Sequence, residues 1–267
     1  MGALRSLSRM AEQHKPSSAI QALYDLCRDT FTPSASSYPP PPTAIEKLTS
    51  LLDTIGPADV GLSDASKEDD RGRGPFGILS FSRVDRWAQP INYVDIHEGE
   101  NFTMCMFCFP TSAVIPLHDH PGMTVFSKVL YGSLHVKAYD WVEPACIRKI
   151  EGNNKSSVTV RLAKLAADKV LTAPCNTSVL YPRRGGNLHA FTAVTPCAIL
   201  DILAPPYDDS AGRKCSYYHD YPCPISPLDE DGSGSGKDEE YAWLSEIDTP
   251  PDLHMVSRNY AGPSVKK

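Results

Sequence analysis

The chain has 267 residues, of which 41% are hydrophobic, and its formal net charge at pH 7 is -6. This length allows one large domain or two small ones, and no apolar run is long enough to cross a bilayer. The mild acidity and the lack of a dense Lys/Arg cluster exclude the electrostatic footprint of a nucleic-acid-binding protein. We therefore expect neither a nucleic-acid partner nor a membrane partner.

The first 16 residues are polar and lack the apolar stretch of a secretory signal, so they predict a disordered tail. The chain contains eight cysteines. Without a secretory context these are expected to be reduced thiols rather than disulfides, and the expected location is cytoplasmic, nuclear or both.

Two amphipathic helices are expected after this tail. Apolar residues fall at helical spacing between residues 17 and 31. In the second helix Thr43 is expected to cap the N-terminus, Glu46 to complete a capping box, and the Gly-Pro pair at 56–57 to end the helix. Together they predict a helical cover over residues 17–60 that packs against the main body.

The pattern of residue types changes over residues 75–206, where short runs of β-branched, aromatic and apolar residues alternate with Gly, Pro, Asn and Asp. Strands are predicted at 76–81, 103–109, 123–130, 133–141, 157–164, 179–181, 189–194 and 198–203. Many short strands without helical spacers indicate a mainly β sandwich or closed barrel. The chain beyond residue 206 is expected to be irregular, with a flexible loop at 229–240 and a short amphipathic piece at 241–247. One domain over residues 17–260 is therefore expected.

The sharpest signal is a pair of histidines, His118 and His120, in the segment Pro-Leu-His-Asp-His-Pro-Gly-Met. Side chains alternate along a strand, so two histidines two positions apart at a strand end point to the same face, as two ligands of one metal must. Such a pair alone also fits two surface histidines on a loop. A third histidine, His189, stands in a Gly-rich turn before an apolar strand. Across a barrel it would complete a facial set with open positions for substrate and oxygen.

Other candidates for a metal or redox site are weaker. His97 is interpreted as structural and His135 as a packed or surface residue. Cys105 and Cys108 form a Cys-x-x-Cys pair, but residues three apart on a strand face opposite sides, and no second pair or nearby histidine completes a zinc set. They are interpreted as small hydrophobic residues.

Four further residues stand out by their setting. Asp201 interrupts an apolar strand, where a carboxylate must be paired or functional because an unpaired buried charge is costly. It fits either a structural acid bonded to backbone or arginine, or a functional group. Tyr207 follows two prolines that stiffen its loop, and it also fits an ordinary loop tyrosine. Cys215 and Tyr217 are two apart in an extended segment and therefore share a face.

The histidine spacing resembles that of the cupin superfamily, in which two β motifs supply the metal ligands. Gly132 matches the glycine of the first motif, and Gly186 stands three residues before His189 as in the second motif. Val125 takes the position of the usual glutamate, and Ala193 that of the usual asparagine. Three neutral imidazoles leave a ferrous ion its full charge, which favours an anionic ligand such as a thiolate. Three-histidine cupins with this departure resemble the thiol dioxygenases.

The match is narrower at residues 92–98, 115–125, 130–141 and 199–207, which resemble the plant cysteine oxidases, relatives of the animal cysteamine dioxygenase. The resemblance covers roughly residues 18–260. It implies a cupin-type (double-stranded β-helix, jelly-roll) barrel with the N-terminal helices packed outside, and Fe(II) held by His118, His120 and His189.

The same resemblance implies an activity and its partners. The enzyme would use O2 to oxidise the N-terminal cysteine of target proteins to cysteine sulfinic acid, an oxygen-sensing step of the arginine N-degron pathway. The implied targets are transcription regulators of the hypoxia response. Asp201 would hold the substrate amine or a histidine ligand, Tyr207 would line the substrate entrance, and Cys215 and Tyr217 would belong to the pocket. We expect a monomer, because no exposed apolar stripe is evident.

Three alternatives stay open. The first is a small-thiol dioxygenase acting on free cysteine or cysteamine, for which Arg183 and Arg184 are the nearest candidates to bind a free carboxylate. The second is a non-catalytic cupin that binds sugar or protein, although such a module has no need for a full set of histidines. The third is another metal-cupin chemistry, whose enzymes usually keep the glutamate that Val125 replaces.

Overall fold

A computed structural model describes residues 18–32, 39–62, 90–151, 157–223 and 240–267. Its helices are α1 (Ala19–Thr30), α2 (Pro42–Thr54), and the short 3-10 helices η1 (Pro57–Val60) and η4 (Asp209–Ala211). Its strands are β1 (Ile91–Glu98), β2 (Thr103–Phe109), β3 (Val114–Asp119), β4 (Thr124–Tyr131), β5 (Ser133–Trp141), β6 (Ile147–Glu151), β7 (Ser157–Thr172), β8 (Ser178–Leu180), β9 (Leu188–Ala193), β10 (Cys197–Ala204), β11 (Tyr217–Cys223), β12 (Tyr241–Ile247) and β13 (Met255–Arg258). The tail expected at 1–16, the strand expected at 76–81 and nearly all of the loop expected at 229–240 lie outside the described residues.

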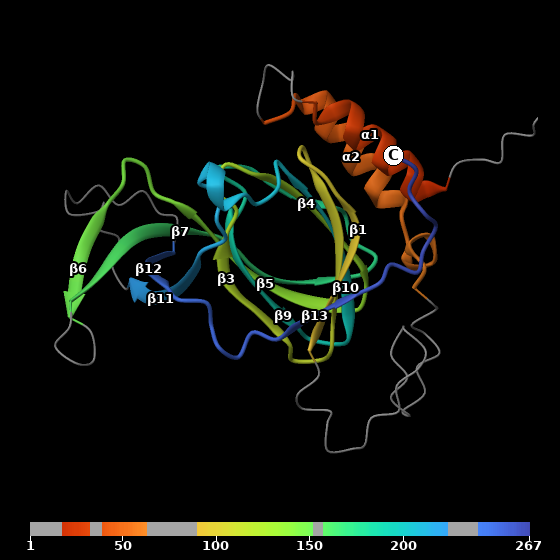
Figure 1. Cartoon of the computed structure of the whole chain (residues 1–267). Helices are drawn as coiled ribbons and strands as arrows, with labels where there is room; N and C mark the ends of the chain where they lie inside the picture. Colours follow the sequence, from red (N-terminus) through yellow and green to blue (C-terminus); the bar gives the residue numbers. More distant parts are fainter. Residues whose placement is uncertain (1–17, 33–38, 63–89, 152–156, 224–239) are drawn as a thin grey trace, which may run out of the picture.

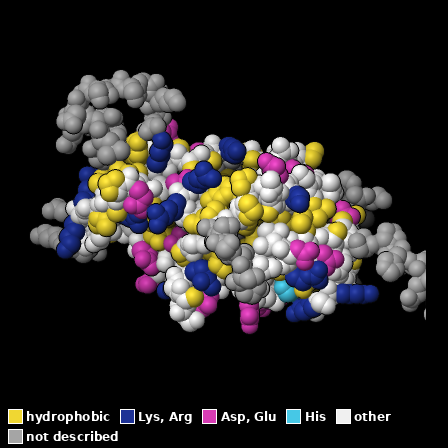
Figure 2. Space-filling view, turned by 90° about the horizontal axis from the view of Figure 1, so that it is seen from above, with side chains coloured by type: hydrophobic (Ala, Val, Ile, Leu, Met, Phe, Trp, Pro, Cys, Tyr) yellow, Lys and Arg dark blue, Asp and Glu magenta, His cyan; other side chains and the backbone are white. Residues whose placement is uncertain are grey.

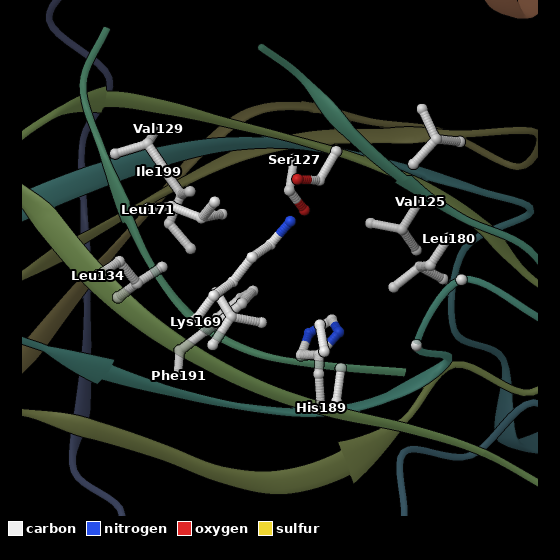
Figure 3. A pocket seen from close by; sticks show the side chains of 17 residues that line it. Val125, Ser127, Val129, Leu134, Lys169, Leu171, Leu180, His189, Phe191 and Ile199 are labelled. Atoms are coloured by element: carbon white, nitrogen blue, oxygen red, sulfur yellow. The ribbon is translucent and has the colours of Figure 1, made fainter. Parts of the chain in front are cut away.

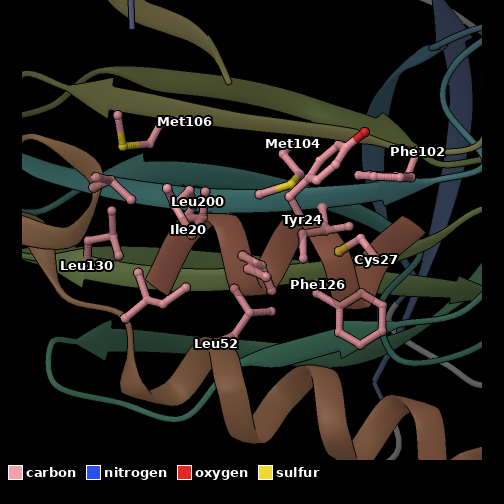
Figure 4. Packing of buried hydrophobic residues seen from close by; sticks show 14 of the residues in the cluster. Ile20, Tyr24, Cys27, Leu52, Phe102, Met104, Met106, Phe126, Leu130 and Leu200 are labelled. Carbon is pink, nitrogen blue, oxygen red and sulfur yellow. The ribbon is translucent and has the colours of Figure 1, made fainter. Parts of the chain in front are cut away.

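Helix α1 forms where the apolar spacing predicts it. Ser18 caps it, because its hydroxyl accepts a hydrogen bond from the backbone N–H of Gln21 at 3.2 Å. Its buried face packs with α2 against the outer face of the sheet of β2, β4 and β10 (Figure 4), through residues that include Leu23, Leu52 and Phe126. Neither α1 nor α2 is long and apolar enough to span a membrane.

The capping box predicted for the second helix from Thr43 and Glu46 is wrong. Helix α2 begins at Pro42, and its N-cap is Pro41, two residues before the predicted cap, which makes no side-chain hydrogen bond. Proline suits the first helical position because its φ is already helical and its missing N–H would have had no partner there.

The strands form two sheets, ordered β13-β1-β2-β10-β4-β8 and β12-β11-β3-β9-β5-β7-β6. Strand β12 also pairs with β7, which closes β12, β11, β3, β9, β5 and β7 into a six-stranded barrel. Figure 1 shows β3, β5 and β9 across from β1, β4 and β10, with both helices outside the latter strands. The predicted mainly β, cupin-type architecture with external N-terminal helices is confirmed.

Strand β10 places one polar side chain inside this architecture. The strand is buried on both faces, and its side chains alternate between two cores. Leu200 and Ile202 pack beneath the helices, whereas Ile199 packs in the interior between the two sheets. Asp201 shares the parity of Ile199 and therefore faces the interior.

The prediction that the chain beyond residue 206 is irregular is wrong, because this part of the chain contributes three strands. β11 and β12 pair with each other over residues 217–223 and 241–247, so the piece expected to dock on the barrel is itself part of its sheet. β13 pairs in parallel with β1. A second correction concerns β7, which continues to Thr172, well past the predicted end at residue 164.

Candidate metal centre

The three histidines meet at one end of β3 and β9. His118 belongs to β3, His120 follows directly after that strand, and His189 belongs to β9, where it is the Cα partner of His118. All three side chains are buried. The pairing of β3 with β9 therefore brings the three imidazoles close together.

The imidazoles are close enough to hold one ion. Their ring centroids lie 4.7 Å apart for His118 and His189, and 4.9 Å apart for each of the other two pairs. One nitrogen atom from each of the three residues lies within 4.8 Å of the others. Nε2 of His120 and Nε2 of His189 are 3.4 Å apart.

Hydrogen bonds to the other ring nitrogens set the tautomers of two ligands. Nδ1 of His118 lies 2.9 Å from the carbonyl oxygen of Pro116, which can only accept, so Nδ1 carries the proton. The Tyr207 hydroxyl donates to the carbonyl oxygen of Asp119 at 2.8 Å, and its oxygen lies 2.8 Å from Nδ1 of His120. That oxygen therefore accepts from Nδ1–H. Both rings are left with a free Nε2 lone pair.

Electrostatics favour the metal-binding form of all three rings. Burial lowers the pKa of His118, and burial followed by the neighbouring imidazoles lowers the pKa of His120 and of His189 well below the usual value. The rings are therefore neutral, as metal ligands must be. Neutral nitrogens with lone pairs this close repel one another unless a cation lies between them. The donor set fits a divalent transition metal with imidazole ligands.

No carboxylate joins the three imidazoles among the residues that the structure describes. Val125, at the position of the usual cupin glutamate, lines the interior cavity beside His189 (Figure 3). A valine offers no lone pair, so a bound divalent ion would keep its charge and accept an anionic substrate group.

A buried amide ties the two ligand segments together. The Asn187 side chain donates to the carbonyl oxygens of His120 and Tyr181, both at 2.9 Å, and accepts from the backbone N–H of His120 at 3.2 Å. Asn187 is two residues before His189, so it joins the backbone of one ligand to the turn that leads into another. Sequence reasoning missed this residue, whose only signal is its place next to the Gly-Gly pair.

A second missed residue fixes the same turn. The Asp140 carboxylate accepts hydrogen bonds from the backbone N–H groups of Gly185, Gly186 and Asn187 at 2.8–3.1 Å. Gly186 has φ of +86°, and a Cβ there would lie 2.6 Å from Cβ of Ala138. Only glycine fits this turn, which brings β9 close enough for His189 to reach the other ligands.

Asp119 lies between two ligands in the sequence but is engaged elsewhere. Its carboxylate accepts hydrogen bonds from the backbone N–H of Ser216 at 2.9 Å and from the Tyr218 hydroxyl at 3.0 Å. These bonds attach the end of β3 to the segment that carries Cys215 and Tyr217. Sequence reasoning did not single out Asp119 for this role.

Asp201 faces the interior from the opposite sheet, where its Cα partners are Cys105 on β2 and Ser127 on β4. Its side chain is 6% exposed, and Ser127 hydrogen-bonds to it, but Oδ1 has no hydrogen-bond partner. Burial raises the pKa of Asp201 to about 7, although the bond from Ser127 lowers it. Among the residues that the structure describes, no arginine pairs with Asp201, and one of its oxygens remains available to a ligand.

Tyr207, Cys215 and Tyr217 gather on the side of His118 and His120. Tyr207 holds the His120 ring through the hydrogen bond described above. The Cys215 side chain hydrogen-bonds with Tyr207 and Tyr217, and burial raises the pKa of its thiol. The Tyr217 ring centroid lies 6.3 Å from that of His118. The structure thus brings these three predicted residues to the imidazoles from two segments.

The cysteines and histidines that the sequence analysis interpreted as non-ligands lie away from this cluster. Cys105 faces the interior near Val125, whereas Cys108 packs beneath the helices, so the two thiols point to opposite sides of β2. His97 packs against aromatic rings, 4.9 Å from the centroid of Tyr24. His135 pairs with Asp168 at 2.6 Å.

The fold and this cluster define a class: a mainly β protein that carries, between its two sheets, a cluster of three neutral histidines able to hold a metal. Comparison with known proteins places the chain within that class. The PCO_ADO family model matches residues 51–265. Plant cysteine oxidase 1 of Arabidopsis thaliana is 41% identical over 93% of this chain and 80% of its own length, and plant cysteine oxidase 2 of the same plant is 42% identical over 93% and 83%. The chain therefore belongs to the PCO_ADO family.

Other similar proteins extend this picture. The 2-aminoethanethiol dioxygenase of Mus musculus is 34% identical over 68% of this chain and 74% of its own length. Among solved structures, an RmlC-like cupin protein from Desulfovibrio desulfuricans is 21% identical and covers 48% of this chain and 93% of its own, with a TM-score of 0.27. The family membership makes this chain an enzyme, an oxidoreductase of the thiol dioxygenase class.

Proposed function

We propose that this chain oxidises the N-terminal cysteine of target proteins to cysteine sulfinic acid, with Fe(II) as its metal and O2 as co-substrate. The observation that carries the proposal is the set of three neutral imidazoles of His118, His120 and His189 with valine at the position of the acidic ligand. Such a site favours an anionic sulfur ligand. The names of the two plant relatives support cysteine as the group that reacts.

The reaction is balanced without another reductant, because a thiol RSH and O2 together give the sulfinic acid RSO2H. Ferrous iron, when bound, would supply the charge that favours the thiolate and the electron density that O2 activation needs. The chain's own residues position the reactants. The unpartnered Oδ1 of Asp201 would accept a hydrogen bond from the substrate amine, and the Tyr207 hydroxyl, hydrogen-bonded to Nδ1 of His120, would keep that ring in its ligand orientation. Cys215 and Tyr217 would line the substrate side.

The biological role that we propose is oxygen sensing in the arginine N-degron pathway, with transcription regulators of the hypoxia response as targets. Slower oxidation at low O2 would leave such targets unmodified. We propose that the protein acts as a monomer in the cytoplasm, the nucleus or both. On the face shown in Figure 2, basic and acidic side chains are interspersed, with no large basic patch of the kind that binds a phosphate backbone.

A small thiol is the second candidate substrate, favoured by the name of the Mus musculus relative. Free cysteine would need a cation for its carboxylate, and Arg183 and Arg184 are the candidates nearest to the motifs. Both are exposed, and the Arg184 guanidinium lies over the Tyr181 ring at 4.8 Å. Neither arginine is buried in the interior that Asp201 faces.

The test is to load the protein anaerobically with Fe(II) and add O2 with a peptide that begins with cysteine, with free cysteine or with cysteamine. Mass spectrometry should show a gain of two oxygen atoms on the peptide. His118→Ala and His189→Ala should abolish this gain, whereas His135→Ala, a matched histidine away from the cluster, should retain it. Product formation by both cluster variants would refute the assignment of the metal site. Preference for a small thiol would replace the peptide substrate with the second candidate.

A further inference from the structure

A partly open cavity of about 100 Å3, which the exposed residue Lys169 helps to line, lies next to His189 (Figure 3). Inward-facing residues of β4, β5, β7, β9 and β10 form its walls, and β8 and the Gly185–Gly186 turn border it. Its side chains are mostly apolar and include Val125, Val129, Leu134, Leu171, Phe191 and Ile199. An apolar space therefore adjoins the metal centre directly.

The size and chemistry of this cavity select a small apolar occupant. It is far smaller than the roughly 300–1,000 Å3 of ordinary ligand pockets. Apolar cavities of about 150 Å3 stay dry and bind benzene or xenon. Lys169 is the one charged side chain among the lining residues, and its amine points toward Ser127 (Figure 3). A peptide does not fit this space, whereas a diatomic gas does.

A second opening serves the other side of the site. A polar groove of about 610 Å3 is lined by Cys215 and Tyr217 together with residues that include Lys214, Glu246 and Asp248. It shares no residue with the apolar cavity. Tyr217 lines this groove and its ring centroid lies 6.3 Å from that of His118, which gives a thiol substrate an approach to the metal ligands separate from the cavity.

We propose that O2 reaches the metal centre through the apolar cavity beside His189, by a route separate from that of the thiol substrate. This inference rests on the proposed function, because it requires O2 to react at the three histidines. It assigns a binding role to the barrel interior that goes beyond the ligand set. The absence of an acidic ligand then has a second consequence, since Val125 forms part of the apolar wall where a glutamate would be.

The kinetic test fills the cavity and leaves the groove unchanged. Val129 is 3% exposed and faces the cavity from β4, so Val129→Phe should occupy its volume. We expect kcat/KM for O2 to fall about fivefold or more, while KM for a cysteine peptide stays within about twofold. Val170→Phe is the matched control, because Val170 is 53% exposed on β7 and does not line the cavity. Ala167→Leu, at a partly exposed lining position, gives a second filled variant if Val129→Phe does not fold.

A structural measurement tests the cavity without turnover. Crystals of the wild-type protein under xenon pressure should show xenon between Val129 and Phe191, and Val129→Phe should exclude it. Normal turnover with no xenon in the cavity, or with an unchanged O2 dependence in a folded filled variant, would overturn the route alone. Failure of every thiol to yield a sulfinate would overturn the proposed function itself.

Discussion

The strands that carry the metal ligands and the strands that face them are built differently. On β3 and β9 each ligand is held by polar contacts, such as the carbonyl of Pro116 on His118 and the Tyr207 hydroxyl on His120. On β4 and β10 the interior surface is apolar, apart from Asp201 and the serine bonded to it. On β3 and β9, hydrogen bonds therefore fix the orientation of the metal ligands. On β10, in contrast, the Asp201 carboxylate has one oxygen without a hydrogen-bond partner, which is free to bind a ligand.

The largest expected effect comes from removing that carboxylate. The pKa of Asp201 is raised from the ordinary 3.8 to about 7, so between these pH values the folded state binds more protons than the unfolded state. The free energy of unfolding of the wild-type protein should fall as pH rises from about 4 to about 7, by about 4 kcal/mol at most. Asp201→Asn cannot titrate and should be more stable than the wild type above pH 7.

Urea unfolding of the metal-free proteins at pH 4.5 and pH 8 measures this difference. The advantage of Asp201→Asn should shrink at the lower pH. Asp252→Asn, at an exposed position, is the matched control and should track the wild type. Parallel pH profiles for Asp201→Asn and the wild type would show that the buried carboxyl is not kept protonated by its surroundings.

A smaller effect is expected on the ligand side. Asn187→Ala removes two hydrogen bonds to the backbone of His120 and one to the carbonyl oxygen of Tyr181, which together tie the His120 ligand to the turn before His189. We expect metal affinity to fall about 10- to 100-fold, as for other residues that orient metal ligands. Anaerobic titration with Fe(II) measures it. Asn92→Ala, which loses a bond to Arg258 at the surface, should bind metal as the wild type does. If both variants bind Fe(II) with the same affinity, Asn187 does not position the metal ligands.

The smallest effect is expected at the turn itself. Asp140→Asn keeps one acceptor oxygen but loses the charge that binds the N–H groups of residues 185–187. The free energy of unfolding should fall by about 1 kcal/mol. Chemical denaturation gives the value, with Asp252→Asn, an exposed position, as the comparison. A variant as stable as the wild type would mean that the glycine turn holds its shape without this carboxylate.

The sequence predicts the parts of the site that depend on strand periodicity. His118 and His120 share a face because two residues separate them, and the parity of Asp201 with Ile199 places it in the interior. The barrel and helix α1 follow from the same kind of local pattern. The predicted roles of Asp201, Tyr207, Cys215 and Tyr217 in catalysis stay predictions.

The parts that the sequence misses depend on contacts between distant segments. Asp140 binds backbone groups 45 to 47 residues away, and Asn187 binds the backbone of His120, 67 residues away, and such distant contacts leave no periodic signal. The strand β11 contains His219, Asp220 and Pro222, a composition that does not read as a strand without its partner β12. The capping box at Thr43 failed because a proline at the first helical position competes successfully with a side-chain cap.

The shared use of β3 and β9 by two cores has one more consequence. Leu117 and Leu188 pack in the small barrel closed by β12, while the residues that follow them, His118 and His189, turn to the opposite face and bind in the interior. Inserting a single residue ahead of either histidine would turn its imidazole into the hydrophobic core of the small barrel. The neighbouring leucine would then take the position of the metal ligand. Length changes within these two strands should therefore be far less tolerable than side-chain changes.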